Sequence, residues 1–215
     1  MTSKVKTTPE VLKPQQLHRI PFWRLWLPLL FQTGIILAAP AQPFYTQLTG
    51  TTAILQTVPV DPYDPIRGYS QTLSYDISQT NNLQNLPGWQ ELMQPDITDP
   101  AVNVVPVGTN LYVTLEAPTS SSTPPTAWKP VRVSRDRPQN LAANQVAIKG
   151  KFTGNTVIYG LETYYMPEAQ RDEINQSISQ AQRDQPQSLV VEVKVDSQGR
   201  AVPISFWVNQ RNYRF

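Results

Sequence analysis

Residues 57–77 read TVPVDPYDPIRGYSQTLSYDI, and this stretch decides the fold class. Its two Asp-Pro pairs predict a rigid corner, because proline fixes its own φ and biases the preceding residue toward extended or turn backbone. The strand that follows alternates in character, since one of its faces carries Tyr69, Gln71, Leu73, Tyr75 and Ile77 and the other carries small polar residues. A fixed corner leading into a half-buried strand predicts a domain built on β-structure.

Composition agrees with that prediction. The 215 residues, 40% of them hydrophobic, are enough for one core of ordinary size plus a tether. The chain has 21 prolines and only 16% charged residues, which favours strands and extended connections over long amphipathic helices. We therefore expect a mainly β domain, either a sandwich or a partly open barrel, with one or two short helices.

Further elements follow from periodicity and turn signals. The sequence predicts a mobile polar loop over 119–126, helical turns within 81–93 and a helix from Pro167 to about Arg183. Gly199 lies in a DSQGR turn that predicts a hairpin. Besides 69–77, we expect strands over 51–58, 110–116, 128–133, 145–152, 155–162, 189–195 and 201–208.

An apolar run over residues 22–39 predicts a membrane anchor. It is just long enough to cross a hydrocarbon core as a helix, which needs about 17–25 residues. Trp23 and Trp26 suit the membrane interface, and Gln32 and Gly34 permit close approach of another helix. The resulting organisation is a basic cytoplasmic arm over 1–20, a transmembrane anchor over 21–40, a linker over 41–50 and an exported β-rich domain over 51–215.

The run has two other interpretations. The run could form a buried core helix of a soluble protein, but this interpretation leaves the basic residues before the run unexplained. A cleavable signal peptide would explain Ala39-Pro40-Ala41, which has the small-x-small form of a processing site. An arm of about 20 residues and Pro28 inside the run are both atypical of signal peptides, so we favour a retained anchor with a cytoplasmic N-terminus.

The residue types present exclude several kinds of chemistry. The chain has no cysteine, and its single histidine, His18, lies in the basic arm. Thiolate sites, disulfides and a Ser-His-Asp triad are therefore excluded from the exported domain. We also expect no cofactor and no metal. A nucleic-acid partner is not expected either, because basic residues do not cluster with aromatic ones. The candidates for a Ser-Lys hydrolase lack a nucleophile motif; they are Lys129, Lys149, Lys151 and Lys194.

Two pairs of carboxylates share a three-residue spacing. They are Asp61 with Asp64 and Asp96 with Asp99, and either pair is able in principle to ligate Ca²⁺ or to act as an acid and base. Three of the four precede proline, which favours local turns in which the carboxylate accepts backbone hydrogen bonds. We therefore interpret both pairs as turn residues.

The order of residues in 61–75 resembles the segment that names the GDYXXLXY family of membrane-anchored bacterial proteins. A second block, Tyr159 through Glu168, resembles another shared segment of that family. The chain departs from the family at Tyr69 and Ser70, where an acidic residue and a tyrosine are expected. The motif residues carried over are Asp61, Asp64, Arg67, Gly68, Leu73, Tyr75, Tyr159, Gly160, Glu162, Tyr164 and Pro167.

This resemblance implies an exported domain behind one N-terminal helix, and it supplies no reaction. Similar sequences are mainly cyanobacterial, which leaves a thylakoid and a plasma membrane both open. Arg67 and Glu162 are lone charges beside aromatic strands, so we expect them to meet, either as a structural pair or as part of a ligand site.

Two functions follow as expectations. The first is an accessory or assembly protein, anchored in the bilayer, whose periplasmic or lumenal domain binds a larger membrane complex or a multi-spanning partner. The alternative is an enzyme or ligand-binding domain of the envelope or lumen that uses Asp61, Asp64, Arg67 and Glu162. We prefer the first and expect no enzyme, because the exported part has no recognised catalytic motif.

Overall fold

The computed structural model describes residues 21–58, 70–120, 122–165 and 189–214. The chain divides into two compact units, Met1–Pro40 and Ala41–Phe215. Helix α1, Trp23–Thr49, passes from the first unit into the second, so its last turns belong with the strands. The expected linker, 41–50, is thus helical to Thr49.

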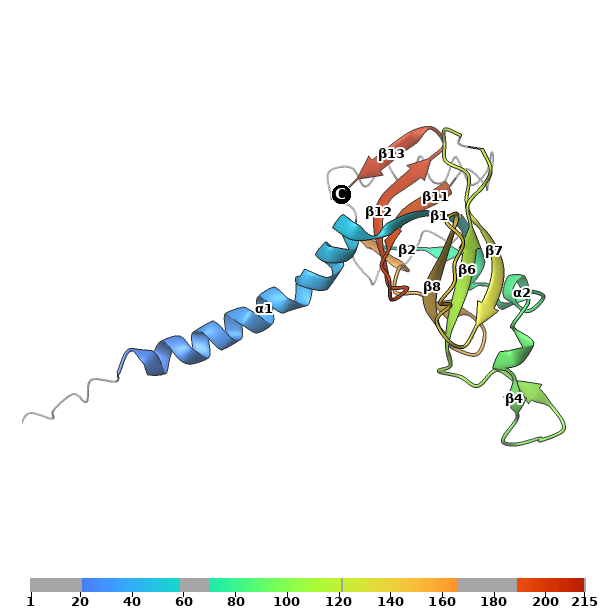
Figure 1. Cartoon of the computed structure of the whole chain (residues 1–215), viewed down its shortest axis with the longest axis horizontal. Helices are drawn as coiled ribbons and strands as arrows, with labels where there is room; N and C mark the ends of the chain where they lie inside the picture. The colour runs from blue at the N-terminus through green and yellow to red at the C-terminus, as the bar shows by residue number, and fades with distance from the viewer. Residues whose placement is uncertain (1–20, 59–69, 121, 166–188, 215) are drawn as a thin grey trace, which may run out of the picture. The chain divides into compact units, whose positions relative to one another are not determined.

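The second unit is mainly β, which confirms the predicted fold class (Figure 1). Its described helical segments are short: 3₁₀ helix η1 (Asp76–Ser78), α2 (Thr80–Leu83) and 3₁₀ helix η2 (Gln90–Leu92). Its strands are β1 (Thr51–Val58), β2 (Ser70–Thr72), β3 (Ser74–Tyr75), β4 (Gln94–Pro95), β5 (Asn103–Val104), β6 (Asn110–Glu116), β7 (Lys129–Ser134), β8 (Gln145–Phe152), β9 (Val157–Ile158), β10 (Thr163–Tyr165), β11 (Leu189–Val195), β12 (Ala201–Val208) and β13 (Arg211–Arg214).

Two antiparallel sheets enclose the core. One has the order β13-β12-β11-β1-β3 and the other has the order β7-β6-β8-β9, while β10-β2 and β4-β5 form separate pairs. The sheets are joined by backbone bonds from Trp128 N–H to the Ile54 carbonyl and from Lys149 N–H to the Gly199 carbonyl, both 2.8 Å. Because one bond joins β1 to the segment before β7 and the other joins β8 to the β11–β12 turn, the two sheets together resemble a partly open barrel.

Alternation along the strands places apolar side chains inside. In β6, Leu111, Val113 and Leu115 are buried in the core, whereas Tyr112 and Glu116 on the other face are only half-buried. Side chains of successive strand residues point to opposite faces, which explains this pattern. The same core includes residues from β1, β8, β11 and β12.

Most predicted strands are confirmed, and five have the predicted bounds: 51–58, 110–116, 145–152, 189–195 and 201–208. The predicted strand 69–77 is wrong as one element, because β2 pairs with β10 and β3 pairs with β1. The predicted strand 155–162 shortens to β9, since Gly160 adopts φ 78° and turns the chain. The predicted helix 167–183 lies outside the described residues.

Candidate functional site

The two segments that carry the family resemblance lie against each other in the core. Tyr75 O–H donates a hydrogen bond of 2.8 Å to the Leu161 carbonyl, and Tyr159 O–H donates one of 2.6 Å to the Ile77 carbonyl. Each segment therefore supplies one phenol to the backbone of the other. Both tyrosines are buried, so these hydroxyls exchange water for a fixed carbonyl acceptor.

Glu162 closes the turn between β9 and β10. Its carboxylate accepts the Tyr159 N–H at 2.6 Å, and its carbonyl accepts the Leu73 N–H at 2.6 Å. Gly160 lies within this turn at positive φ, where a residue with a Cβ is strained. Glu162 thus fixes the backbone of both motif segments and is not held out toward a ligand.

The environment keeps Tyr159 neutral. Burial raises the pKa of its phenol well above the usual range, and the charges of Glu162 and Asp76 raise it further. A phenol with a raised pKa is a weaker acid, and its phenolate is not populated near neutral pH, so Tyr159 is poorly suited to give or take a proton in a reaction. Within the described part of the motif, Tyr75, Tyr159 and Glu162 thus hold the two segments together.

The remaining motif residues are placed only in part. Asp61, Asp64, Arg67, Gly68 and Pro167 lie outside the described residues, as does the expected contact of Arg67 with Glu162. The backbone of Tyr164 pairs with Gln71 in the β10-β2 ladder.

The second carboxylate pair forms local turns, as predicted. Asp96 Oδ1 accepts the Thr98 N–H at 2.7 Å and also its hydroxyl, while Asp99 Oδ1 accepts the Ala101 N–H at 3.1 Å. Among the described residues, no three His, Asp or Glu side chains gather as a metal site would require. Lys149 and Lys151 are exposed on either side of buried Gly150, which confirms their outward orientation on β8.

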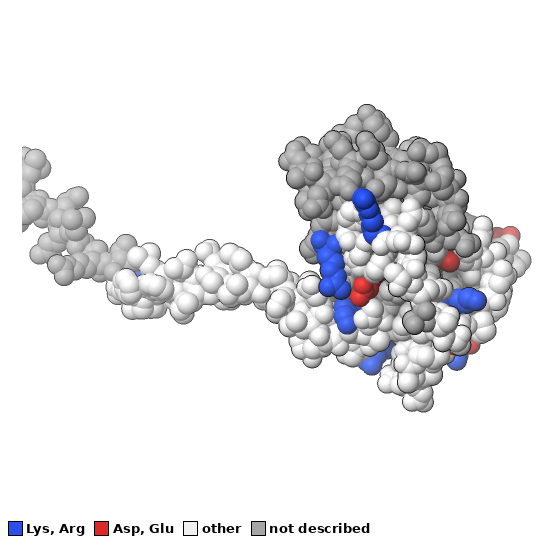
Figure 2. All heavy atoms as spheres, turned by 90° about the horizontal axis from the view of Figure 1, so that it is seen from above, with Lys and Arg blue, Asp and Glu red and all other residues white. Residues whose placement is uncertain are grey.

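Helix α1 has the length and composition of a membrane span. It contains 27 residues, and its most apolar stretch of 18 residues has a mean hydropathy of 1.3 and is not buried in the protein. Arg24 is its only charge, so the helix is almost entirely white in Figure 2. The Arg24 guanidinium lies 5.8 Å from the Trp23 ring centroid, a cation–π arrangement suited to a membrane interface.

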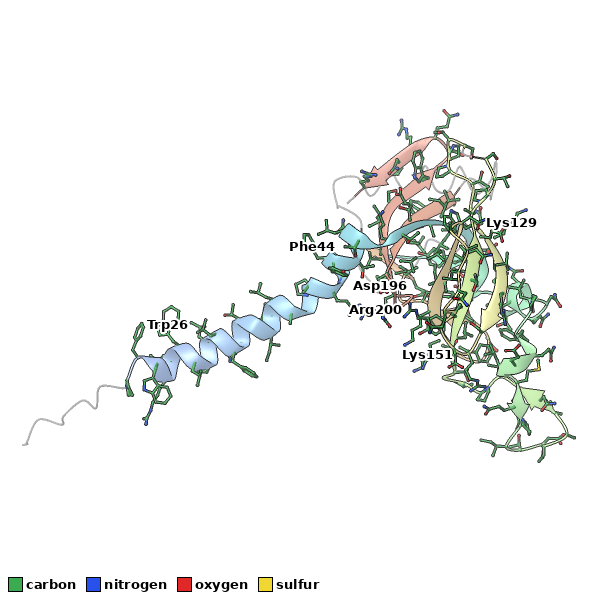
Figure 3. All side chains as sticks on the ribbon, in the orientation of Figure 1. Trp26, Phe44, Lys129, Lys151, Asp196 and Arg200 are labelled. Atoms are coloured by element: carbon green, nitrogen blue, oxygen red, sulfur yellow. The ribbon has the colours of Figure 1, made fainter. Side chains whose placement is uncertain are left out.

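The predicted anchor residues all lie on α1 and are exposed. Trp26 is labelled near its first turn in Figure 3, and its ring packs 5.4 Å from that of Phe22. Gln32 and Gly34 occupy the middle of the run, and a Cβ added at Gly34 would meet no atom within 4 Å. The notch that Gly34 leaves is therefore open.

A polar cleft of about 570 Å³ lies where the loop after β7 returns over the outer face of β6. Its charges balance, since two arginines and two carboxylates line it, and Thr114 forms part of its floor with a buried hydroxyl that has no partner among the described residues. Sequence reasoning missed this cleft because its lining comes from segments far apart in the chain. The charged lining residues are Glu91, Arg132, Arg135 and Asp136.

Comparison with known proteins identifies a family and gives no closer relative. The model of a family described as "GDYXXLXY protein" matches residues 32–206, which is well over half of the chain. No curated protein and no solved structure matches.

Proposed function

The chain belongs to the GDYXXLXY family, and from this membership we propose that it is a membrane-anchored accessory or assembly protein whose β-rich domain binds a larger membrane complex. In this proposal α1 is retained as a single span, the basic arm lies in the cytoplasm, and the domain lies in the periplasm or in a thylakoid lumen. The observation that carries the proposal is the apolar, unburied helix α1.

The length of α1 supports a retained anchor. At about 1.5 Å per residue, 27 residues extend roughly 40 Å, more than the ~30 Å of a hydrocarbon core. The surplus includes Thr46, whose side chain is fully buried and whose hydroxyl lies 3.4 Å from the Asp196 carboxylate in the domain. The helix also continues through Ala39–Ala41, where a processing enzyme would need extended backbone.

The described motif residues favour a binding role over catalysis. Glu162, the one member of the alternative catalytic set that the structure describes, already accepts the Tyr159 N–H. The tyrosines of the motif likewise donate to carbonyls of the core. These groups already form hydrogen bonds within the domain. Binding of a partner by the domain surface is therefore better supported than catalysis.

Native size tests the proposed partner. Membranes that contain the full-length, tagged chain are extracted in a mild detergent and separated by size. We expect the chain to migrate in a particle far larger than one 24.2 kDa chain in a micelle. A particle that holds a single chain and no other protein would contradict the proposal, and extraction in a harsh detergent provides the dissociated reference.

A further inference from the structure

The hairpin formed by residues 94–104 stands out from both sheets (Figure 1). Its two strands, β4 and β5, pair Gln94 with Val104 and Pro95 with Asn103. The chain on either side is fixed in the core, because Leu92 is fully buried before the hairpin and Val105 is buried after it. The 94–104 hairpin is thus a firmly rooted projection.

The tip of this hairpin is held in one conformation. Asp96 N–H donates to the Val102 carbonyl at 2.8 Å, and Val102 N–H donates to the Asp99 carbonyl at 2.9 Å. The carboxylates of Asp96 and Asp99 also accept backbone N–H groups two residues ahead. A loop that is already ordered loses little conformational entropy when it binds.

This ordered tip presents apolar side chains to solvent. Ile97 is 100% exposed and Val102 is 48% exposed. Single exposed aliphatic residues are common on protein surfaces. Here, however, a fully exposed isoleucine lies on a projecting loop whose backbone is hydrogen-bonded, as expected for a residue that fills a pocket on a partner.

Charge indicates what kind of partner fits. Residues 68–128 contain five acidic residues and no lysine or arginine. Two of the five, Asp96 and Asp99, flank Ile97 in the hairpin. The Thr98 hydroxyl and N–H lower the pKa of Asp96, so its charge persists at neutral pH. Carboxylates disfavour anionic lipid surfaces and favour a protein surface that carries cations.

We infer that the 94–104 hairpin is a docking element, and that Ile97 enters an apolar pocket of a protein partner whose rim carries lysine or arginine. The inference rests on the proposed function and names the surface through which the domain recognises its partner. The matched reference is Val107, which is 74% exposed and lies outside the hairpin.

Native sizing of full-length variants gives the first test. The Ile97→Asp variant is expected to dissociate from the large assembly. Its affinity for the partner should fall by ~30-fold, as for loss of a central residue of an interface. Ile97→Ala should weaken the assembly less, and Val107→Ser should leave it unchanged. Retention of Ile97→Asp in the assembly would overturn the inference. A circular dichroism spectrum and an unfolding midpoint equal to wild type show that each variant is folded.

A photo-crosslinking residue at position 97 of the full-length chain, in its own membrane, gives the second test. We expect an adduct with a different protein chain, with a yield at least ~10-fold above that from position 107. Raised ionic strength should lower the yield, because it screens the rim charges. Adducts with lipid alone, with a second copy of this chain, or in equal yield from both positions would each overturn the inference.

The outcomes separate this inference from the proposed function. If wild type and Ile97→Asp migrate equally in a large assembly, the inference about the hairpin is wrong and the proposed function stands. If wild type migrates as a lone chain, both fail.

Discussion

Tyr75 and Tyr159 are the residues that join the two motif segments. The alternation in 69–77 predicted correctly that Leu73, Tyr75 and Ile77 would be buried. The alternation did not predict which group accepts the hydrogen bond of the Tyr75 phenol, because that acceptor is the Leu161 carbonyl, 86 residues away in sequence. Periodicity indicates which face of a strand is buried, whereas the partner of a buried polar group depends on the tertiary fold.

Removal of either phenol should destabilise the domain. We expect Tyr159→Phe to lower the free energy of unfolding by about 1–2 kcal/mol, because the Ile77 carbonyl loses its donor in a buried site. Tyr75→Phe should have a similar effect through Leu161. Urea denaturation of the detergent-solubilised chain measures both. Tyr112→Phe is the control, because Tyr112 is half-buried and its hydroxyl makes no such bond within the described part of the chain. Equal stability of all three variants would contradict this role.

Asp76 should destabilise the domain at neutral pH. Burial raises the pKa of its carboxyl above 3.8, and Oδ1 has no partner among the described residues. The folded state therefore favours the protonated carboxyl. Protonated Asp76 contributes to stability below pH 3.8, and this contribution is lost as the pH rises through the pKa of the folded state. We expect Asp76→Asn to be more stable than wild type at pH 7. The difference in free energy of unfolding between the two proteins should become smaller in acid. A difference that becomes larger in acid would contradict the assignment.

At the scale of elements, the last turns of α1 contact the β11–β12 turn. Thr46 O–H donates to the Gln42 carbonyl at 3.1 Å and also contacts Asp196, whose carboxylate pairs with Arg200 Nε at 2.8 Å. Figure 3 labels Asp196 and Arg200 together at this turn. Burial alone would raise the pKa of Asp196, but hydrogen bonds from Arg200 and Gln198 lower it. The sequence predicted the hairpin from Gly199 and not the contact with α1.

Gly50 is the residue that permits this contact. A Cβ at position 50 would lie 2.6 Å from the Thr46 carbonyl oxygen and 3.0 Å from the backbone N and O of Val195. These are backbone atoms that cannot rotate away, so Gly50→Ala should lower the free energy of unfolding by about 1–3 kcal/mol. Thermal denaturation measures the effect.

Gly34→Ala is the matched control, because its added Cβ meets nothing within 4 Å. Its effect on domain stability should stay within about 0.5 kcal/mol. A Gly50→Ala domain as stable as this control would show that α1 and the strands are not packed as described.

At the scale of the whole molecule, the sequence predicted what local pattern determines: the long apolar helix, most of the strands and the mainly β class. It did not predict β13, the 94–104 hairpin or the cleft lined by Arg132 and Arg135. β13 is only four residues long and polar, with little periodicity to detect. Asp96 and Asp99 were interpreted correctly as turn residues, yet their sequence did not reveal that the turn displays Ile97 in solvent.

In the proposed topology, one retained helix separates a cytoplasmic arm from an exported domain, and the accessibility of two positions tests this topology most directly. Because the chain has no cysteine, Lys4→Cys and Ser122→Cys each provide a unique site for an impermeant maleimide. Sealed right-side-out and inside-out membrane vesicles should label the two positions from opposite sides, both on the uncleaved 24.2 kDa chain. Labelling of both positions from the same side, or a shorter chain free of the membrane, would contradict the account.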